Sequence, residues 1–339
     1  MTAETRATTN DAVIGVDVGG TKTRLLLAPV VGDTTKTLRD VVVPTASWCD
    51  ELGDTRRVAV SLHGLIVDRL GPSMRDVTLV VGAHGCENTA HCRAFERELA
   101  ALWNGPVTVV NDAELIPPAM GAGDAIGIVV GTGSIAVARD RDGEMVAAGG
   151  WGWLLGDDGS APALVRDAIR AVLSELDRGE SGRACADPLV PLLLHAFDAD
   201  DAAGLALAAT RRASAPEWGE HAPLVFAAAE SGSPAARRVI SRAATALAGL
   251  VETLRERGIS ADRVVAGGAV IQTQPRLQQA LRDELSHRCP DIRLDILDRE
   301  PAWGAVALAR RRCDAGRRTR SGNGAQDIQR DRRRTETQS

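Results

Sequence analysis

Two aspartates stand at the ends of short apolar runs with strand character, where a carboxylate can do chemistry. Asp17 lies near the end of Val13–Val18, and Asp112 follows Val107–Val110 and Asn111. A carboxylate in the first position can hold the water shell of Mg²⁺, which usually keeps several of its waters. One in the second position can accept the proton of an acceptor hydroxyl. We therefore expect Asp17 to hold Mg²⁺ through water and Asp112 to act as general base.

Two glycine turns carry hydroxyl side chains between β-prone runs. The first reads Gly19-Gly20-Thr21-Lys22-Thr23, and the second reads Gly131-Thr132-Gly133-Ser134. Backbone N–H groups in such turns form nests for phosphate oxygens. Neither turn fits the Walker or the dinucleotide pattern, because both of those lead into a helix. Either turn alone is better explained as a plain hairpin, with Lys22 solvated, but together with the two aspartates the turns predict an ATP site in which Lys22 can touch a phosphate.

The elements that must position these residues alternate between strands and helices. Period-two and continuous apolar runs predict strands, and apolar residues at helical spacing predict helices. For the first half we expect strands at 13–18, 24–28, 41–43, 77–81 and 107–110, with helices at 52–70 and 90–103. After Pro117-Pro118 we expect strands at 126–130, 134–138, 264–266 and 292–297, and helices within 161–258 and at 274–287 and 302–312. Breaks are expected at 179–182 and 232–234, and the pattern as a whole predicts a mixed α/β protein.

Length and composition agree with an ordinary globular chain of two domains. The chain has 339 residues, 44% of them hydrophobic and 25% charged. It contains no long uncharged apolar run, and its first residues do not resemble a signal peptide, so we expect a cytoplasmic protein with no membrane association. Six cysteines follow no repeated spacing and are expected to be reduced thiols: Cys49, Cys86, Cys92, Cys185, Cys289 and Cys313.

The charge is distributed unevenly between the body and the C-terminal end. Residues 310–339 hold ten arginines against four acidic residues, or +6, which leaves −11 for the rest of a chain whose net charge is −5. An acidic body does not attract phosphate backbones, so we expect no nucleic-acid partner. The basic tail, 314–339, has almost no apolar residues and is expected to be disordered.

Several of these motifs resemble a known superfamily. Val13–Ala28 and Gly131–Ser134 resemble the two phosphate loops of the acetate and sugar kinase, heat-shock ATPase and actin superfamily, and Val264–Val270 resembles its adenosine loop. More specifically, Val109–Ala113 and Gly149–Ser160, the latter reading GGWGWLLGDDGS, are similar to N-acetylglucosamine kinases of the BadF/BadG/BcrA/BcrD ATPase family. The similarity extends from about Ala12 to Arg312.

This resemblance implies a fold, a cofactor and a set of site residues. It implies a two-domain actin-like ATPase fold of the ribonuclease H-like type, with ATP and Mg²⁺ in the interdomain cleft. The expected domains are 12–116 with 299–313, and 117–298 with a helical insertion. ATP contacts are expected from both glycine turns and from Gly267 and Gly268. Substrate contacts are expected from His84, Gly85, Asn111, Asp112, Thr132, Gly150, Trp151 and Asp157.

The sequence departs from the family pattern on the acceptor side. Where such sugar kinases usually place an asparagine, the chain reads Pro44-Thr-Ala-Ser-Trp48, and where they carry a serine between glycines it reads Val81-Gly-Ala-His-Gly-Cys86. His84 either contacts the substrate or is a neutral loop histidine. Asp157 either binds ring hydroxyls or caps the helix that starts near Ala161.

Three functions remain open at this point. The first is an ATP-dependent kinase of an amino sugar such as N-acetylglucosamine or glucosamine. The second is a kinase of a sugar-like cyclitol, because the departures fall on the acceptor side. The third is an activator ATPase of the 2-hydroxyacyl-CoA dehydratase type, although none of the six cysteines matches its cluster-binding context. A homodimer is left open as the assembly.

Overall fold

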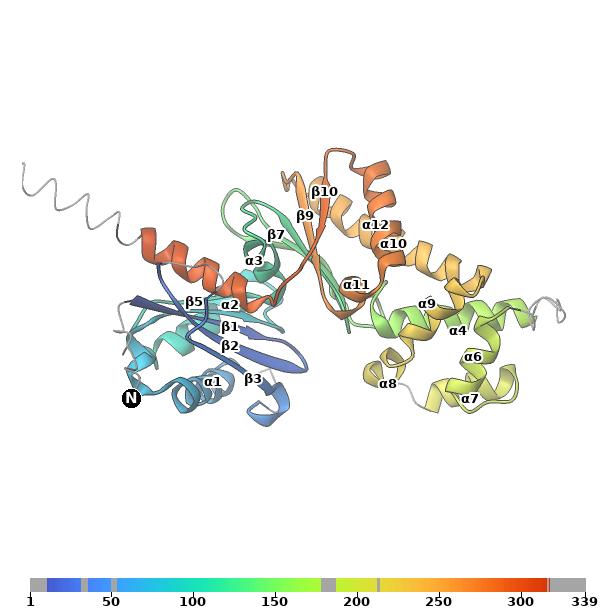
Figure 1. Ribbon diagram of the computed structural model, residues 1–339, viewed down its shortest axis with the longest axis horizontal. Helices are drawn as coiled ribbons and strands as arrows, with labels where there is room; N and C mark the ends of the chain where they lie inside the picture. Colours follow the sequence, from blue (N-terminus) through green and yellow to red (C-terminus); the bar gives the residue numbers. More distant parts are fainter. Residues whose placement is uncertain are drawn as a thin grey trace, which may run out of the picture. The chain divides into compact units, whose positions relative to one another are not determined.

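The computed structural model describes residues 11–31, 36–49, 54–177, 187–211, 214–315 and 317 (Figure 1). The chain forms two compact units, one from residues up to Gly121 together with those from Glu300 onward, and one from Ala122–Arg299. Each unit contains a five-stranded sheet with helices packed on it. The α/β class expected from the sequence is therefore confirmed.

The sheet of the first unit has the order β3-β2-β1-β4-β5. Its strands are β1 (Ala12–Val18), β2 (Lys22–Pro29), β3 (Arg39–Pro44), β4 (Thr78–Ala83) and β5 (Val107–Asn111). β1 and β2 form the antiparallel hairpin predicted around the first glycine turn, whereas β4 and β5 run parallel to β1. The core strands read as near-continuous apolar runs because both faces of the sheet are covered.

Strand register brings the chemistry-bearing residues to one edge of this sheet. Asp17 is paired with Gly82 on β4, and Ala83 is paired with Asn111 on β5. His84 and Asp112 follow these paired positions directly. In open α/β sheets the carboxyl ends of parallel strands are where ligands bind.

Different helices cover the two faces of the first sheet. The helices α1 (Thr55–Leu70) and α2 (Thr89–Ala100) pack on one face. A helix over residues 302–315 packs on the other through Ala302, Ala305, Val306 and Ala309. The approach of this helix is close, since a Cβ on Gly15 would lie 2.7 Å from the Val306 backbone nitrogen.

The second unit repeats the hairpin with a parallel extension. Its sheet has the order β10-β9-β6-β7-β8, in which β6, β7 and β8 are antiparallel neighbours and β9 and β10 continue in parallel. The strands are β6 (Ile126–Val130), β7 (Ser134–Arg139), β8 (Met145–Gly149), β9 (Arg263–Gly267) and β10 (Arg293–Ile296).

Helices build most of the second unit, and they share one large apolar core with its sheet. The long helix α10 packs against α4, α9 and α12. The helices are α4 (Ala161–Asp177), α6 (Leu189–Ala196), α7 (Ala202–Arg211), α8 (Ala215–Gly219), α9 (Ala222–Glu230), α10 (Pro234–Glu256), α11 (Ala269–Thr273) and α12 (Pro275–Arg288).

The structure differs from the sequence expectation at several element boundaries. The second helix ends at Ala100 instead of Trp103, because the Trp103 side chain turns into the core and its Nε1 donates to the Val77 carbonyl at 2.8 Å. After β5 the chain forms a 3₁₀ helix (Asp112–Leu115) and the short α3 (Ile116–Ala119), where two prolines suit a first helical turn. The last helix continues to residue 315, so Asp314 and Ala315 are not part of a disordered tail.

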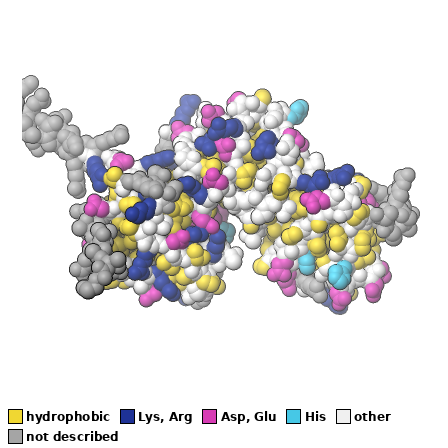
Figure 2. Space-filling model, viewed as in Figure 1, with side chains coloured by type: hydrophobic (Ala, Val, Ile, Leu, Met, Phe, Trp, Pro, Cys, Tyr) yellow, Lys and Arg dark blue, Asp and Glu magenta, His cyan; other side chains and the backbone are white. Residues whose placement is uncertain are grey.

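Residues 316 and 318–339, and the expected break at 179–182, lie outside the described residues. Among the described helices, none combines the length and apolar character needed to cross a bilayer. On the face shown in Figure 2, acidic and basic side chains are interspersed over each unit and do not gather into a broad basic surface.

Candidate active site

Asp17 provides a buried carboxylate at the end of β1. It is 9% exposed. Loss of solvation raises the pKa of Asp17 to about 7, and the negative charges of Asp112 and Glu300 add to this, while Lys22 and Arg24 oppose it. A cation beside this carboxylate would offset both the lost solvation of its negative charge and the repulsion from Asp112 and Glu300.

Asp112 begins the 3₁₀ helix that follows β5, and its carboxylate is partly fixed there. Its Oδ1 accepts from the Ala113 N–H at 3.0 Å, and its Oδ2 lies 3.9 Å from Nδ1 of His84. Burial raises the pKa of Asp112, and the electrostatic interaction with His84 and the hydrogen bond from the Ala113 N–H partly oppose that shift. The carboxylate therefore has the elevated proton affinity that suits a general base.

The buried side chain of Asn111 holds this turn through hydrogen bonds. It is 3% exposed, its Nδ2 donates to the Cys86 carbonyl at 3.1 Å, and its Oδ1 accepts from the Ala113 N–H at 2.9 Å. The Asn111 N–H in turn donates to Glu114 at 3.0 Å, which completes a capping box. The substrate contact expected from Asn111 stays a prediction.

His84 lies between the Asp112 carboxylate and the first glycine turn. Its backbone N–H donates to the Val18 carbonyl at 2.8 Å, and Gly85 after it has a φ of 86°, which favours glycine. A Cβ on Gly20 would lie 3.8 Å from Cδ2 of the His84 ring. The ring is exposed. Both alternatives, a substrate contact and a loop histidine, stay open for His84.

The first glycine turn is supported by residues of the stretch that departs from the family pattern. The Gly19 N–H donates to the Lys22 carbonyl at 3.0 Å and closes the turn. Gly20 and Thr21 form the tip of the turn and are exposed. Thr45 is buried beneath it, donating through its hydroxyl to the Gly19 carbonyl at 2.7 Å and through its N–H to the Thr21 carbonyl.

Thr23 does not have the role expected for it. We expected its hydroxyl to contact phosphate, but the residue is fully buried. Its Oγ1 lies 3.0 Å from the Thr45 hydroxyl and accepts from Nε1 of Trp48 at 3.0 Å. Thr23 therefore supports the turn from inside because it belongs to β2 and faces the core.

Glu300 is a site residue that the sequence analysis missed. It forms ion pairs with Lys22 at 3.3 Å and with Arg24 at 2.9 Å. The Lys22 pair joins residues 278 positions apart, so no local pattern could have revealed it. Lys22 is thereby held beside the turn while its side chain remains largely exposed.

In the second unit, the second glycine turn lies against the Gly267-Gly268 loop. A Cβ on Gly131 would lie 3.6 Å from the Ala269 backbone nitrogen. Gly268 has a φ of 109°, and a Cβ there would lie 2.5 Å from the Val130 carbonyl oxygen, so only glycine fits. Thr132 at the tip is exposed, whereas Ser134 is buried and donates through Oγ to the Asp158 carbonyl at 2.9 Å. Ser134 thus anchors the turn and does not present its hydroxyl.

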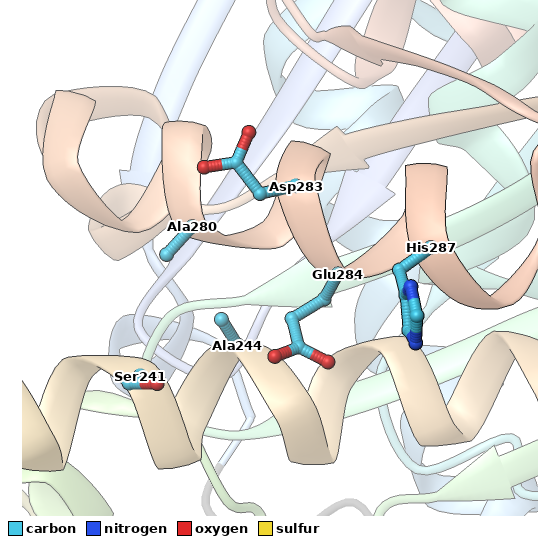
Figure 3. Close-up of a pocket in the computed structure, with 6 residues that line it drawn as sticks. All are labelled: Ser241, Ala244, Ala280, Asp283, Glu284 and His287. Carbon is cyan, nitrogen blue, oxygen red and sulfur yellow. The ribbon is translucent and has the colours of Figure 1, made fainter.

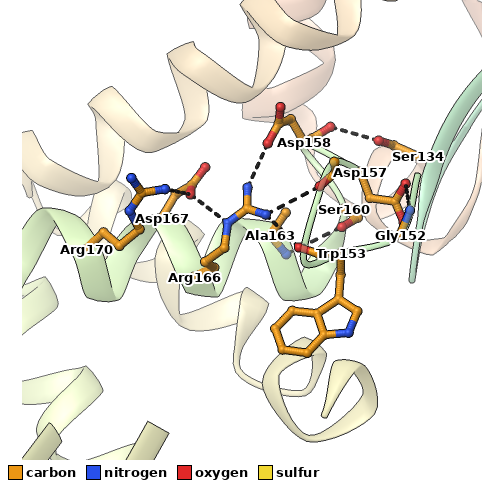
Figure 4. A network of polar contacts seen from close by, with 11 residues as sticks. Ser134, Gly152, Trp153, Asp157, Asp158, Ser160, Ala163, Arg166, Asp167 and Arg170 are labelled. Atoms are coloured by element: carbon orange, nitrogen blue, oxygen red, sulfur yellow. Dashed lines mark hydrogen bonds and ion pairs between the residues drawn. The ribbon is translucent and has the colours of Figure 1, made fainter. Parts of the chain in front are cut away.

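The loop from Gly150 to Ser160 brings Asp157 against the second glycine turn. Asp157 has a φ of 53°, and its Oδ2 would lie 2.9 Å from a Cβ on Gly133. Its Oδ1 accepts from the Gly152 N–H at 3.3 Å. Directly before α4, the Oγ of Ser160 accepts from the Ala163 N–H at 3.4 Å and so provides a helix cap (Figure 4). The contact of Asp157 with ring hydroxyls stays a prediction.

The apolar side chains of this loop divide into two groups. Trp153 packs against Trp218 with ring centroids 5.1 Å apart. Within the second unit, Trp151 is 75% exposed, and Leu154 and Leu155 are exposed as well. The substrate contact expected from Trp151 stays a prediction.

We also looked for a cluster of metal-binding side chains and for a further pocket. Among the residues that the structure describes, no three His, Cys, Asp or Glu side chains gather as a metal site, His84, Cys86, His91 and Cys92 included. A separate pocket of about 270 Å³ lies between α10 and α12 (Figure 3). Its Glu284 already accepts from Thr245 and pairs with Arg288.

Known proteins resemble this chain over most of its length. The sequence model of the BadF/BadG/BcrA/BcrD ATPase family matches residues 14–309. The chain is 29% identical, over 89% of its length and 99% of the relative, to the N-acetylmuramic acid/N-acetylglucosamine kinase of Clostridium acetobutylicum. It is 23% identical, over 87% of its length and 97% of the relative, to the N-acetyl-D-glucosamine kinase of Dictyostelium discoideum.

A solved structure shows the same fold. The ROK family glucokinase from Streptomyces griseus, in complex with glucose and AMPPNP, superposes with a TM-score of 0.54. The two sequences are 19% identical, with 88% of this chain and 98% of that chain covered.

Proposed function

The chain belongs to the BadF/BadG/BcrA/BcrD ATPase family, and from this premise we propose that it is an ATP-dependent kinase that phosphorylates a hydroxyl of an amino sugar. N-acetylglucosamine and glucosamine are the first candidates, and N-acetylmuramic acid joins them because the Clostridium relative carries that name. One observation carries the proposal most directly. Asp17 and Asp112 stand at the carboxyl ends of β1 and β5, two parallel strands on either side of β4, next to a glycine turn whose tip is exposed.

The residues present fit ATP and Mg²⁺. A single buried carboxylate, Asp17, matches a Mg²⁺ ion that keeps its waters and takes its other ligands from phosphates. The ion would neutralise charge on the transferred phosphoryl group. Backbone N–H groups at Gly20, Thr21, Thr132 and Gly133 are suited to phosphate oxygens. That one ATP is held by loops of both units stays a prediction.

Asp112 would act on the acceptor. As a carboxylate it accepts the proton of the sugar hydroxyl while the oxygen forms a bond to the γ-phosphorus, and the bond to the β-γ bridging oxygen breaks to release ADP. The Ala113 N–H fixes Oδ1, so Oδ2 is the atom available for the proton. Asn111 and Glu114 hold the turn in place.

The acceptor would be held by the loop that carries Asp157. Polyhydroxylated rings need carboxylate acceptors for their hydroxyls beside an apolar wall. Asp157, Gly150 and Trp151 supply this combination within the second unit. Acceptor contacts from His84 and Gly85 of the first unit stay a prediction.

The test is an ADP-release assay on the full chain with a panel of acceptors. The panel contains N-acetylglucosamine, glucosamine, N-acetylmuramic acid, glucose and a cyclitol, and ³¹P NMR of the product locates the phosphorylated hydroxyl. An amino sugar should have the highest kcat/KM. A cyclitol that exceeds every sugar would replace the acceptor, and iron in the purified protein together with ATP hydrolysis without an acceptor would favour an activator ATPase.

A further inference from the structure

Arg166 lies on α4, in the second turn of the helix, and reaches back to the loop that precedes it (Figure 4). Its Nη1 donates to the Trp153 carbonyl at 2.6 Å and more weakly to the Gly156 carbonyl at 3.4 Å. Its Nη2 donates to Oδ1 of Asp158 at 2.7 Å. The side chain is only 17% exposed. One guanidinium thus contacts the loop on both sides of Asp157.

Further contacts of this loop include the bond from the Gly152 N–H to Oδ1 of Asp157 at 3.3 Å and the bond from the Ser134 hydroxyl to the Asp158 carbonyl at 2.9 Å. Gly150, Gly152, Asp157 and Gly159 all have positive φ, a conformation that costs free energy at Asp157 and leaves the glycines many alternatives. Leu154 and Leu155 are exposed within the unit and add little buried apolar surface. The backbone bonds from Leu155 and Gly156 to the Gly152 carbonyl close only the outer turn.

Asp167 orients the guanidinium from the helix side. Its Oδ1 accepts from Nε of Arg166 at 3.0 Å, so every edge of the guanidinium has a partner. A planar fork with fixed donors can hold two carbonyls and a carboxylate together, which the single ammonium of lysine cannot reproduce.

We infer that Arg166 is a positioning residue for the acceptor, because it fixes the backbone on both sides of Asp157 and so aims that carboxylate at the ring hydroxyls. The inference rests on the proposed function for the identity of the acceptor. It adds a residue that makes no contact with the sugar. Since Asp157 also lies against Gly133 of the second glycine turn, the same clamp holds the two loops of this unit together.

The experiment compares Arg166→Ala and Arg166→Lys with Arg170→Ala, and adds Asp157→Ala as reference. Arg170 lies one turn further along α4 and is largely exposed, and within the described part of the chain its ion-pair partner is Asp167, at 3.8 Å. Arg166→Ala should raise the acceptor KM about 10-fold or more with a smaller change in the KM for ATP, because the charge-assisted bonds to the loop are lost. Arg166→Lys should fall between, and Arg170→Ala should change KM by less than about twofold.

Amide hydrogen exchange gives a readout that does not need an acceptor. The N–H groups of Gly152, Leu155 and Gly156 should exchange faster in both Arg166 variants, while those inside α10 should not change. If Arg166→Ala fails to fold, Arg166→Lys and Asp158→Asn test the same contacts.

The outcomes separate the two proposals. A folded Arg166→Ala with wild-type acceptor KM and protected loop amides overturns the positioning role. If the loop amides lose protection but no sugar or cyclitol is phosphorylated even by the wild type, the proposed function fails and the clamp stands. If Arg166→Ala raises the acceptor KM and Asp157→Ala does not, the clamp acts on a different loop group and its aim at Asp157 is wrong.

Discussion

The candidate site residues fall into two halves, one within each unit, and the two are positioned by different physical means. In the first unit, Asp17 and Asp112 are set by the register of parallel strands, and neighbouring charges tune them. In the second unit, Asp157 lies on a glycine-rich loop with exposed apolar side chains, and an arginine from the following helix holds it. A residue placed by strand register can be found from sequence pattern alone, whereas one placed by a long side chain cannot. The strand-positioned half is therefore expected to tolerate changes of its surroundings better than the loop half.

The largest expected effect belongs to the strand half. Asp112→Asn keeps the shape of the side chain but removes the proton acceptor, so kcat should fall by about 10² to 10⁴. Glu87→Gln is the matched control, because Glu87 is exposed and acts on Asp112 only through its charge. Near wild-type turnover of Asp112→Asn, with ATP binding intact, would mean that another group takes the proton.

The same half predicts the pH dependence of activity. Because burial raises the pKa of Asp112 above the ordinary 3.8, the base becomes protonated at a higher pH than a surface aspartate would. The acidic limb of kcat/KM should therefore lie above pH 4, with activity falling as the pH falls through it. A profile that is flat down to about pH 4 would contradict this assignment.

Asp17→Asn should change the free energy of unfolding and the Mg²⁺ requirement in different ways. In metal-free buffer the raised pKa of Asp17, about 7 against 3.8, means that its penalty develops as the pH rises between these values. Asp17→Asn should therefore be more stable than wild type above pH 7, by up to about 4 kcal/mol, and no more stable below pH 4. Denaturant unfolding at pH 8 and pH 4 checks this.

Although Asp17→Asn should be more stable above pH 7, its activity should be impaired. Asp17→Asn should need more Mg²⁺ for half-maximal rate, because the water shell of the ion loses a charged acceptor. An unchanged magnesium requirement would remove Asp17 from the metal site.

The loop half predicts a change in affinity instead of rate. Asp157→Ala leaves ring hydroxyls without a partner, at a cost of about 1 to 3 kcal/mol, so the acceptor KM should rise roughly 5- to 150-fold. The melting temperature should stay close to wild type, since Ser160 and not Asp157 caps α4. Ser160→Ala should show the converse, with about 1 kcal/mol less stability. A lower melting temperature and unchanged KM for Asp157→Ala would restore the purely structural role.

The smallest effect is expected from the C-terminal end. Truncation after Arg317 removes a segment whose composition cannot support a core, so turnover should be unaltered. A large loss of activity would show that the removed segment contributes to the site or to its folding.

The sequence predicted the first half of the site well because the relevant interactions are local or periodic. Apolar runs flanked by glycine turns revealed β1, β2, β6 and β7, and the residues at the ends of β1 and β5 were correctly placed at strand ends. Thr23 and Ser134 were misjudged because a hydroxyl beside a glycine turn can face either way, and here both are buried.

The remaining residues depend on partners that no sequence pattern links. Glu300 reaches Lys22 across most of the chain, and Thr45 reaches Gly19 from a neighbouring strand end. Arg166 could have been suspected only as a charged residue in the apolar first turns of α4, a helix otherwise buried there.

The chain leaves its first unit after Gly121 and returns to it only at Glu300. On the ribosome, the face of the first sheet that Ala302, Ala305 and Val306 will cover therefore remains bare while residues 122–299 are made. At about 5 to 20 residues per second this interval lasts roughly 10 to 40 s. The second unit, which is continuous in the chain, can complete its core earlier, so the N-terminal part of the protein is the last to mature. A nascent chain held short of residue 300 should accordingly show a protease-resistant second unit beside an N-terminal sheet still open to chaperones.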